Sequence, residues 1–231
     1  MTARTGLRGD VAVLVPAAGL GVRLGPGGPK ALRLLGGEPL LVHAVRRVAA
    51  AGAECIVVAA PPGEIDAVRQ LLEPVAPVLV VPGGATRQES VSLALAAVPD
   101  GFDIVLVHDA ARAMAPPSLA IAVADAVRSG HDAVIPVLPV VDTVKEVAAS
   151  GHVVGTVDRA VLRAVQTPQG FRRSVLAAAH ANAGDQHTDD AGMVEKLGVP
   201  VFCVPGDEAA MKITRPVDLL IAEALLGTLS A

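Results

Sequence analysis

The sequence predicts an α/β fold, a three-layer α/β/α sandwich built on a mostly parallel, Rossmann-like sheet. Three observations indicate this: short apolar runs recur along the chain, stretches with helical spacing separate them, and a glycine-rich loop follows the first run. The apolar runs are Val11–Val15, Ile56–Ala60, Val78–Val81, Ile104–Val107 and Ala133–Val137. Strands that are apolar almost throughout are expected where helices cover both faces of a parallel sheet.

Helical spacing of apolar residues is clearest in Leu40–Val48 and Val91–Val98. Residues Thr86–Glu89 fit a capping box ahead of the second of these stretches. Pro116-Pro117 opens a further helix, which Gly130 closes. Because ligands of open parallel sheets collect beyond the carboxyl ends of the strands, the loops that follow the apolar runs should face one crevice.

The pattern changes between residues 139 and 159. Val140–Val147 alternates apolar and polar residues, Ser150-Gly151 forms a turn, and Val153-Val154 returns as a partner strand. We interpret this segment as a protruding β-arm on a single domain of residues 1–231. An isolated hairpin is marginal in water, so the arm is expected to pack on a second copy in a homodimer. The alternative is that it folds back as an edge of its own sheet.

Composition excludes several partners. No apolar run approaches the ~18 residues that span a bilayer. The chain has 3 Phe, no Trp, no Tyr and a net charge of −4, so neither a nucleic-acid surface nor a membrane partner is expected. We interpret Cys55 and Cys203, far apart in apolar runs, as two buried thiols in a reducing compartment, and we place the protein in the cytoplasm.

The strongest chemical signal is the loop Pro16–Lys30, directly after the first predicted strand. Gly19 and Gly21 let backbone N–H groups approach an anion closely, and Arg23 and Lys30 bring two cations to the same loop. This combination is typical of a loop that holds a nucleoside triphosphate.

Two better-known phosphate loops fit less well. A dinucleotide fingerprint requires a third glycine where Leu24 stands, and a Walker A loop requires Ser or Thr where Ala31 follows the lysine. Glu38 comes too early to be the ribose-binding acid of a dinucleotide site. A nucleotide-binding oxidoreductase and a non-catalytic nucleotide sensor nevertheless remain alternatives from different functional classes.

Further motifs extend nearly to the end of the chain. They are Gly83–Val91, His108-Asp-Ala-Ala-Arg112, Asp142-Thr143, Thr156–Arg159, Gln166-Thr-Pro-Gln169, Thr188–Ala191 and Lys212-Ile-Thr-Arg-Pro216. With the glycine loop, they make the sequence resemble the 2-C-methyl-D-erythritol 4-phosphate cytidylyltransferases, which have a nucleotide-diphospho-sugar transferase fold. Ribitol 5-phosphate cytidylyltransferases share most of these motifs and remain the nearest alternative.

The resemblance implies transfer of CMP from CTP to a small phosphorylated polyol, with release of pyrophosphate in non-mevalonate isoprenoid biosynthesis. By resemblance, Arg23 and Lys30 stabilise the pentavalent transition state, and Arg159 and Lys212 position the acceptor phosphate. A phosphate monoester is largely dianionic at neutral pH, so no catalytic base is required. Mg²⁺ is the expected cofactor, held mainly on the CTP phosphates, with Asp109 as a candidate protein ligand.

The resemblance also implies a set of substrate-binding residues. Cytosine is expected near Ala17, Ala18, Gly19, Gly84 and Ser90, and the acceptor near Asp109, Arg112, Thr143, Thr167 and Thr188. Asp109 could instead meet the ribose or cap a helix, although the next helix is predicted to begin only near Pro117. Thr167 and Thr188 have an equal claim to be turn caps. The family often differs from this sequence at Ala31–Arg33, Ala85 and Ala210.

Overall fold

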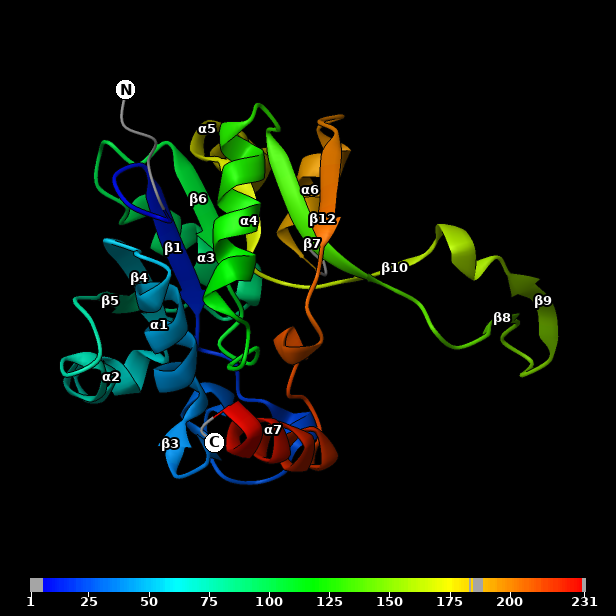
Figure 1. Cartoon of the computed structure of the whole chain (residues 1–231), viewed down its shortest axis with the longest axis horizontal. Coiled ribbons are helices and arrows are strands. Elements are labelled where there is room, and N and C mark those ends of the chain that lie inside the picture. The colour runs from blue at the N-terminus through cyan, green and yellow to red at the C-terminus, as the bar shows by residue number, and fades with distance from the viewer. Residues whose placement is uncertain (1–5, 183, 185–188, 230–231) are drawn as a thin grey trace.

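The structure is a computed structural model that describes residues 6–182, 184 and 189–229 (Figure 1). Its centre is an eight-stranded sheet in the order β12-β7-β11-β6-β1-β4-β5, with β10 beside the end of β7. The strands are β1 (Val11–Pro16), β4 (Cys55–Ala60), β5 (Leu79–Pro82), β6 (Ile104–Val107), β7 (Ala133–Pro139), β10 (Arg163–Val165), β11 (Gln169–Arg172) and β12 (Val201–Pro205). The five predicted strands are therefore confirmed within a residue or two at each end.

The sheet is mostly parallel. Strand β1 pairs in parallel with β4 and β6, β4 pairs in parallel with β5, and β7 pairs in parallel with β12. Strands β10 and β11 run in the opposite direction. These two short strands, and β12, are not among the runs that the sequence predicted, because each is brief and carries polar or exposed residues.

Helices cover both faces of the sheet, as predicted. One face packs against α1 (Leu40–Ala50), α2 (Ile65–Leu72) and α4 (Pro117–Arg128), and the other against α3 (Arg87–Ala96), α5 (Arg173–Asn182) and α6 (Asp190–Lys196). Successive residues of β1 alternate between these two cores, as side chains of a strand must. A third, smaller core joins α7 (Pro216–Leu229) to Leu35 of β2 (Leu34–Leu35), a strand that pairs with β3 (Glu38–Pro39).

The predicted helix ends are confirmed, with one difference. Thr86 is the N-cap of α3, and its hydroxyl accepts a hydrogen bond from the Glu89 N–H at 3.0 Å. The Glu89 carboxylate accepts from the Ala85 N–H at 2.7 Å, one residue earlier than a capping box requires. Helix α4 begins at Pro117, so Asp109 is not a helix N-cap.

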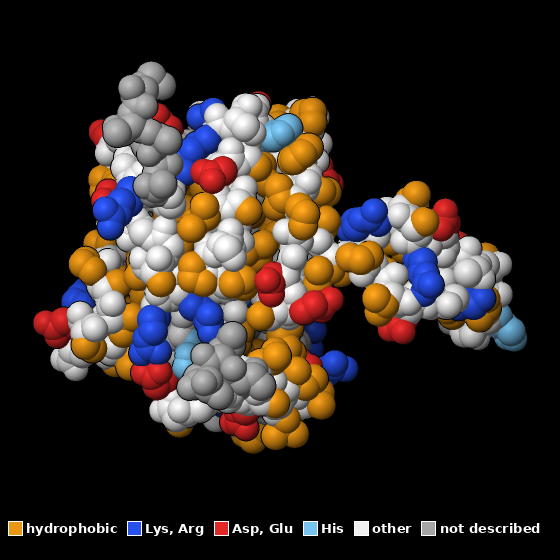
Figure 2. Space-filling view, in the orientation of Figure 1, with side chains coloured by type: hydrophobic (Ala, Val, Ile, Leu, Met, Phe, Trp, Pro, Cys, Tyr) orange, Lys and Arg blue, Asp and Glu red, His pale blue; other side chains and the backbone are white. Residues whose placement is uncertain are grey.

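The predicted arm is present as a two-stranded antiparallel sheet of β8 (Val144–Val147) and β9 (Val153–Val157), which extends away from the body in Figure 1. Among the described residues these strands pair only with each other, so the arm does not form an edge of the main sheet. Figure 2 shows hydrophobic side chains on its surface, and Val147, Val153 and Val154 are each more than half exposed.

The prediction of two buried thiols is wrong. Cys55 is half-buried at the start of β4, and Cys203 is exposed. Cys203 lies on β12, for which β7 is the only partner strand among the described residues, so β12 forms an edge of the sheet. None of the described helices has the length and apolar character needed to cross a membrane.

Candidate active site

The glycine loop folds back on itself at the carboxyl end of β1. The Ala17 N–H donates to Ala59 O at 2.8 Å, which joins the start of the loop to β4, and the Lys30 N–H donates to Gly19 O at 3.0 Å, which closes it. Gly21 has a φ of +66°, and a Cβ there would lie 2.4 Å from the Lys30 Cβ. Glycine at this position therefore lets Lys30 approach the loop and aim its side chain inward.

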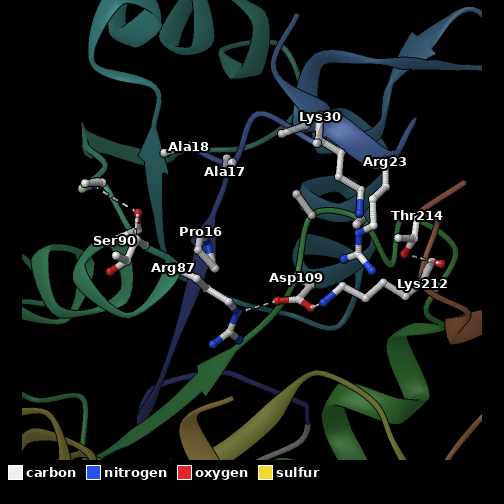
Figure 3. A pocket seen from close by; sticks show the side chains of 18 residues that line it. Pro16, Ala17, Ala18, Arg23, Lys30, Arg87, Ser90, Asp109, Lys212 and Thr214 are labelled. Atoms are coloured by element: carbon white, nitrogen blue, oxygen red, sulfur yellow. Dashed lines mark hydrogen bonds and ion pairs between the residues drawn. The ribbon is translucent and has the colours of Figure 1, made fainter. Parts of the chain in front are cut away.

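A pocket of about 270 Å³ opens between this loop and the carboxyl ends of β5 and β6 (Figure 3). Its lining consists of Pro16, Ala17, Ala18, Gly19, Gly21, Arg23, Lys30, Ala31, Gly84, Ala85, Thr86, Arg87, Ser90, Asp109, Ala110, Ala111, Lys212 and Thr214. The lining includes nine of the residues predicted from the sequence: Ala17, Ala18, Gly19, Arg23, Lys30, Gly84, Ser90, Asp109 and Lys212. The crevice thus lies where an open α/β sheet places its ligands.

Three cationic side chains converge on one side of the pocket. In Figure 3, Arg23 and Lys30 descend side by side from the glycine loop toward Lys212. Burial, together with Lys212 and Arg23, lowers the pKa of Lys30 against the opposing effect of Asp109, and the net value is about 8. An ammonium group held among other cations and partly removed from water favours an anionic ligand.

Asp109 is bound on both sides. Its Oδ1 accepts from Arg87 Nε at 3.0 Å, and its Oδ2 lies 2.7 Å from Lys212 Nζ. Its backbone N–H donates to Thr167 Oγ1 at 3.0 Å. Burial raises the pKa of the Asp109 carboxyl, but Arg87 and Lys212 lower it by more, so the net pKa is well below the ordinary value. The carboxylate is therefore ionised across the neutral range and anchors two cations.

The opposite side of the pocket is built from small residues, with Gly84, Ala85 and Ser90 in its lining. The Gly84 N–H donates to Ser90 Oγ at 3.1 Å, and that hydroxyl donates to Thr86 O at 2.9 Å. A Cβ on Gly84 would meet the Glu89 side chain at 2.2 Å, so the loop can follow this path only with glycine. Backbone groups held at fixed positions are suited to reading the polar edge of a ligand.

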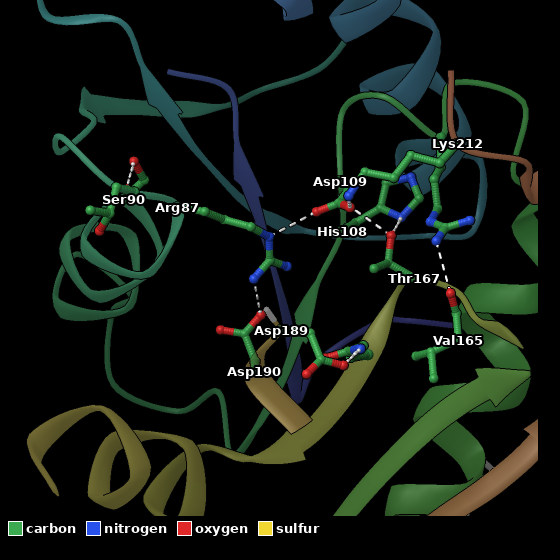
Figure 4. A network of polar contacts seen from close by, with 12 residues as sticks. Arg87, Ser90, His108, Asp109, Val165, Thr167, Asp189, Asp190 and Lys212 are labelled. Atoms are coloured by element: carbon green, nitrogen blue, oxygen red, sulfur yellow. Dashed lines mark hydrogen bonds and ion pairs between the residues drawn. The ribbon is translucent and has the colours of Figure 1, made fainter. Parts of the chain in front are cut away.

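Some predicted residues lie outside the pocket of this chain. The Arg112 guanidinium is buried and donates to Ala210 O at 2.6 Å and to Val165 O, at the end of β10, at 2.9 Å, so it is used inside the fold and does not line the crevice. Thr167 is buried behind Asp109 (Figure 4). Thr143 and Arg159 are exposed on the arm, where Arg159 donates to Val141 O. Thr188 lies outside the described residues.

Among the lining residues that were not predicted for the site, Arg87 and Thr214 have polar side chains. Arg87 is the first residue of α3 and contacts both Asp109 and Asp190, at 3.0 and 2.7 Å. Thr214 lines the pocket beside Lys212. The capping pattern at Thr86 was a usable signal for Arg87, because it places that arginine at the helix end that faces the crevice.

Comparisons with known proteins agree with this geometry. Residues 11–228 match the family model described as 2-C-methyl-D-erythritol 4-phosphate cytidylyltransferase. Proteins of that name from Frankia casuarinae and Streptomyces coelicolor are 59% and 56% identical, over 94% of this chain and 81% and 84% of theirs.

Solved structures show the same likeness. The crystal structure of 2-C-methyl-D-erythritol 4-phosphate cytidylyltransferase from Thermus thermophilus is 39% identical with a TM-score of 0.77, over 94% of this chain and 98% of that one. A 4-diphosphocytidyl-2C-methyl-D-erythritol synthase from Anaerococcus prevotii is 26% identical with a TM-score of 0.82, over the same shares. The chain therefore belongs to the 2-C-methyl-D-erythritol 4-phosphate cytidylyltransferase family.

Proposed function

We propose that this protein transfers CMP from CTP to 2-C-methyl-D-erythritol 4-phosphate, forming CDP-methylerythritol and pyrophosphate in non-mevalonate isoprenoid biosynthesis. Family membership supports the reaction. The observation that carries it is the convergence of Arg23, Lys30 and Lys212 beside a pocket built on a glycine loop. As part of this proposal the enzyme acts in the cytoplasm.

The reaction needs charge neutralisation more than proton transfer. An oxygen of the acceptor phosphate attacks the α-phosphorus of CTP, a new P–O bond forms, and the bond from the α-phosphorus to the bridging oxygen breaks as pyrophosphate leaves. The attacking oxygen is already ionised at neutral pH, so no base is assigned. In this proposal Arg23 and Lys30, which lie side by side in the pocket, stabilise the negative charge that builds on the transferred group.

The acceptor side requires a second chain in this proposal. Lys212 contacts Asp109 in the pocket, but Arg159 and Thr143 are on the arm. We propose that the arm crosses to a partner in a homodimer and delivers both residues to the partner's pocket. The exposed valines of β8 and β9, which a free hairpin would leave in water, support this arrangement.

Mg²⁺ is proposed as the cation that accompanies CTP. Of the described residues that line the pocket, Asp109 is the only carboxylate, and its two oxygens are engaged by Arg87 and Lys212. Among the described residues no cluster of three or more His, Cys, Asp or Glu could hold a metal. We therefore assign Mg²⁺ mainly to the CTP phosphates, where it would neutralise charge on the leaving pyrophosphate.

A coupled assay for pyrophosphate release tests the function. With CTP and Mg²⁺, we expect rapid release with 2-C-methyl-D-erythritol 4-phosphate and little with ribitol 5-phosphate. The opposite preference would reassign the enzyme to the ribitol class. CTP binding without turnover with either acceptor would favour a nucleotide sensor. Oxidation of added NADH by the enzyme alone would favour an oxidoreductase.

The depressed pKa of Lys30 predicts a pH dependence. Burial, Lys212 and Arg23 lower this pKa more than Asp109 and Asp218 raise it, and the net value is about 8. Below pH 8 the ammonium is charged and attracts the triphosphate, whereas above pH 8 it is neutral in the free enzyme. We expect kcat/KM for CTP to fall as pH rises through about 8, because this parameter reports the free enzyme. The control is Lys30→Arg, which stays charged and should lack this alkaline limb even if its overall rate is lower.

A further inference from the structure

We propose that Asp190 is a positioning residue for this active site: it holds Arg87, which orients Asp109, which in turn places Lys212 in the pocket. The inference rests on the proposed function and adds to it a residue that does not line the pocket. Figure 4 shows this line of charged side chains running from the interior to the crevice.

Asp190 is buried completely at the start of α6, yet it does not cap that helix. The N-cap is Asp189, whose Oδ1 accepts from the Gly192 N–H at 3.1 Å and whose Oδ2 accepts from Gln169 Nε2 at 2.8 Å. The Asp190 carboxylate turns the other way, with Oδ2 2.7 Å from Arg87 Nη1 and Oδ1 3.2 Å from His180 Nε2. A fully buried carboxylate that is not needed for the helix end calls for another role.

Arg87 joins the two carboxylates through different nitrogens. Its Nη1 donates to Asp190 and its Nε donates to Asp109 Oδ1 at 3.0 Å. A planar guanidinium that meets two separate acceptors in this way is held in one orientation. A lysine at this position would keep the charge but could not reproduce the fork.

The orientation of Arg87 decides which Asp109 oxygen remains available to Lys212. With Nε on Oδ1, the other oxygen, Oδ2, lies 2.7 Å from Lys212 Nζ. Without Asp190, Arg87 would keep Asp109 as its only carboxylate partner among the described contacts. The guanidinium could then turn to engage both oxygens of Asp109 and compete with Lys212.

Asp190→Asn tests the proposal, because it removes the charge at nearly constant volume. We expect kcat/KM for the acceptor to fall about 10- to 100-fold, as displaced positioning groups typically cause. We expect KM for CTP to change less than about threefold, because among the described residues neither Arg23 nor Lys30 forms a hydrogen bond or ion pair with Asp190, Arg87 or Asp109. Asp66→Asn, which removes the same charge from an exposed ion pair with Arg69, is the matched control and should behave as wild type.

A double-mutant cycle separates positioning from general stability. If Asp190 acts through Arg87, then Asp190→Asn should have little further effect on kcat/KM in an Arg87→Met background. Additive losses, or unchanged acceptor kinetics in Asp190→Asn, would overturn the proposal. If Asp190→Asn does not fold, Arg87→Lys replaces it and should show the same acceptor-specific loss, with Arg69→Lys as its control.

A structural readout keeps this proposal distinct from the proposed function. In a crystal structure of Asp190→Asn, we expect Arg87 to have left its bridging position and Lys212 Nζ to lie beyond ion-pair distance of Asp109. That result would support the positioning role even if the wild-type enzyme used a different acceptor. Unmoved Arg87 and Lys212 would reject it, whatever the assay showed.

Discussion

Replacing Lys30 with alanine is expected to lower kcat by about 10²- to 10³-fold while leaving the fold intact. Loss of one contact to the charge that develops in a transition state typically costs this much. The thermal stability of the variant should not fall together with kcat. The pKa of Lys30 is lowered in the folded chain, so the charged ammonium opposes folding at pH 7, and its removal should leave Tm equal to or above that of wild type.

Single-turnover kinetics at saturating CTP and a thermal melt measure the two parts of this prediction. The matched control is Lys196→Ala at the C-terminal end of α6, an exposed lysine outside the pocket lining, which should turn over as wild type. Unchanged kcat in Lys30→Ala would remove this residue from the transition state. A large fall in Tm would instead mean that the glycine loop depends on the lysine for its structure.

Arg159→Ala is expected to lower kcat/KM by about 10²-fold. Co-expression with a chain that carries Lys30→Ala should restore part of the lost activity. If the arm crosses between subunits, a mixed dimer of Lys30→Ala and Arg159→Ala chains has one pocket with both defects and one with neither. Random pairing makes half of the dimers mixed, so co-expression should restore about a quarter of wild-type activity.

Without crossing, every pocket of the mixed dimer keeps one defect and activity stays low. The homodimers of each variant, purified separately, provide the baseline. Light scattering on both variants shows whether their chains still form dimers. A fully active wild-type monomer would exclude the crossed arm altogether.

Several features of the site follow from local sequence. The glycine loop was predicted because its signals are adjacent in the chain: a strand, glycines free to adopt positive φ, and two cations. The N-cap at Thr86 is equally local, since a hydroxyl bonds an N–H three residues later. Resemblance to a known family then added Lys212, which lies far along the chain from the loop it faces.

Other predictions failed or stayed open because their outcome depends on neighbours distant in sequence. Arg112 belongs to a recognised motif, but its guanidinium is bound by the carbonyl groups of Val165 and Ala210. Cys203 stands in an apolar run typical of a buried strand, yet β12 is at the sheet edge. An apolar pattern indicates a strand, but it does not say how many neighbours that strand will have.

The sequence by itself determined the α/β class, the main parallel strands, the glycine-rich loop after the first strand and the projecting hairpin, because periodicity, glycine conformation and helix capping act over a few residues. Only the tertiary structure decided that Arg87 connects Asp109 with Asp190. Asp190 lies 103 residues after Arg87 in the chain. The physical reason is that an ion pair depends on the burial and geometry of both partners. Those are set by how strands and helices pack, and no local pattern encodes them.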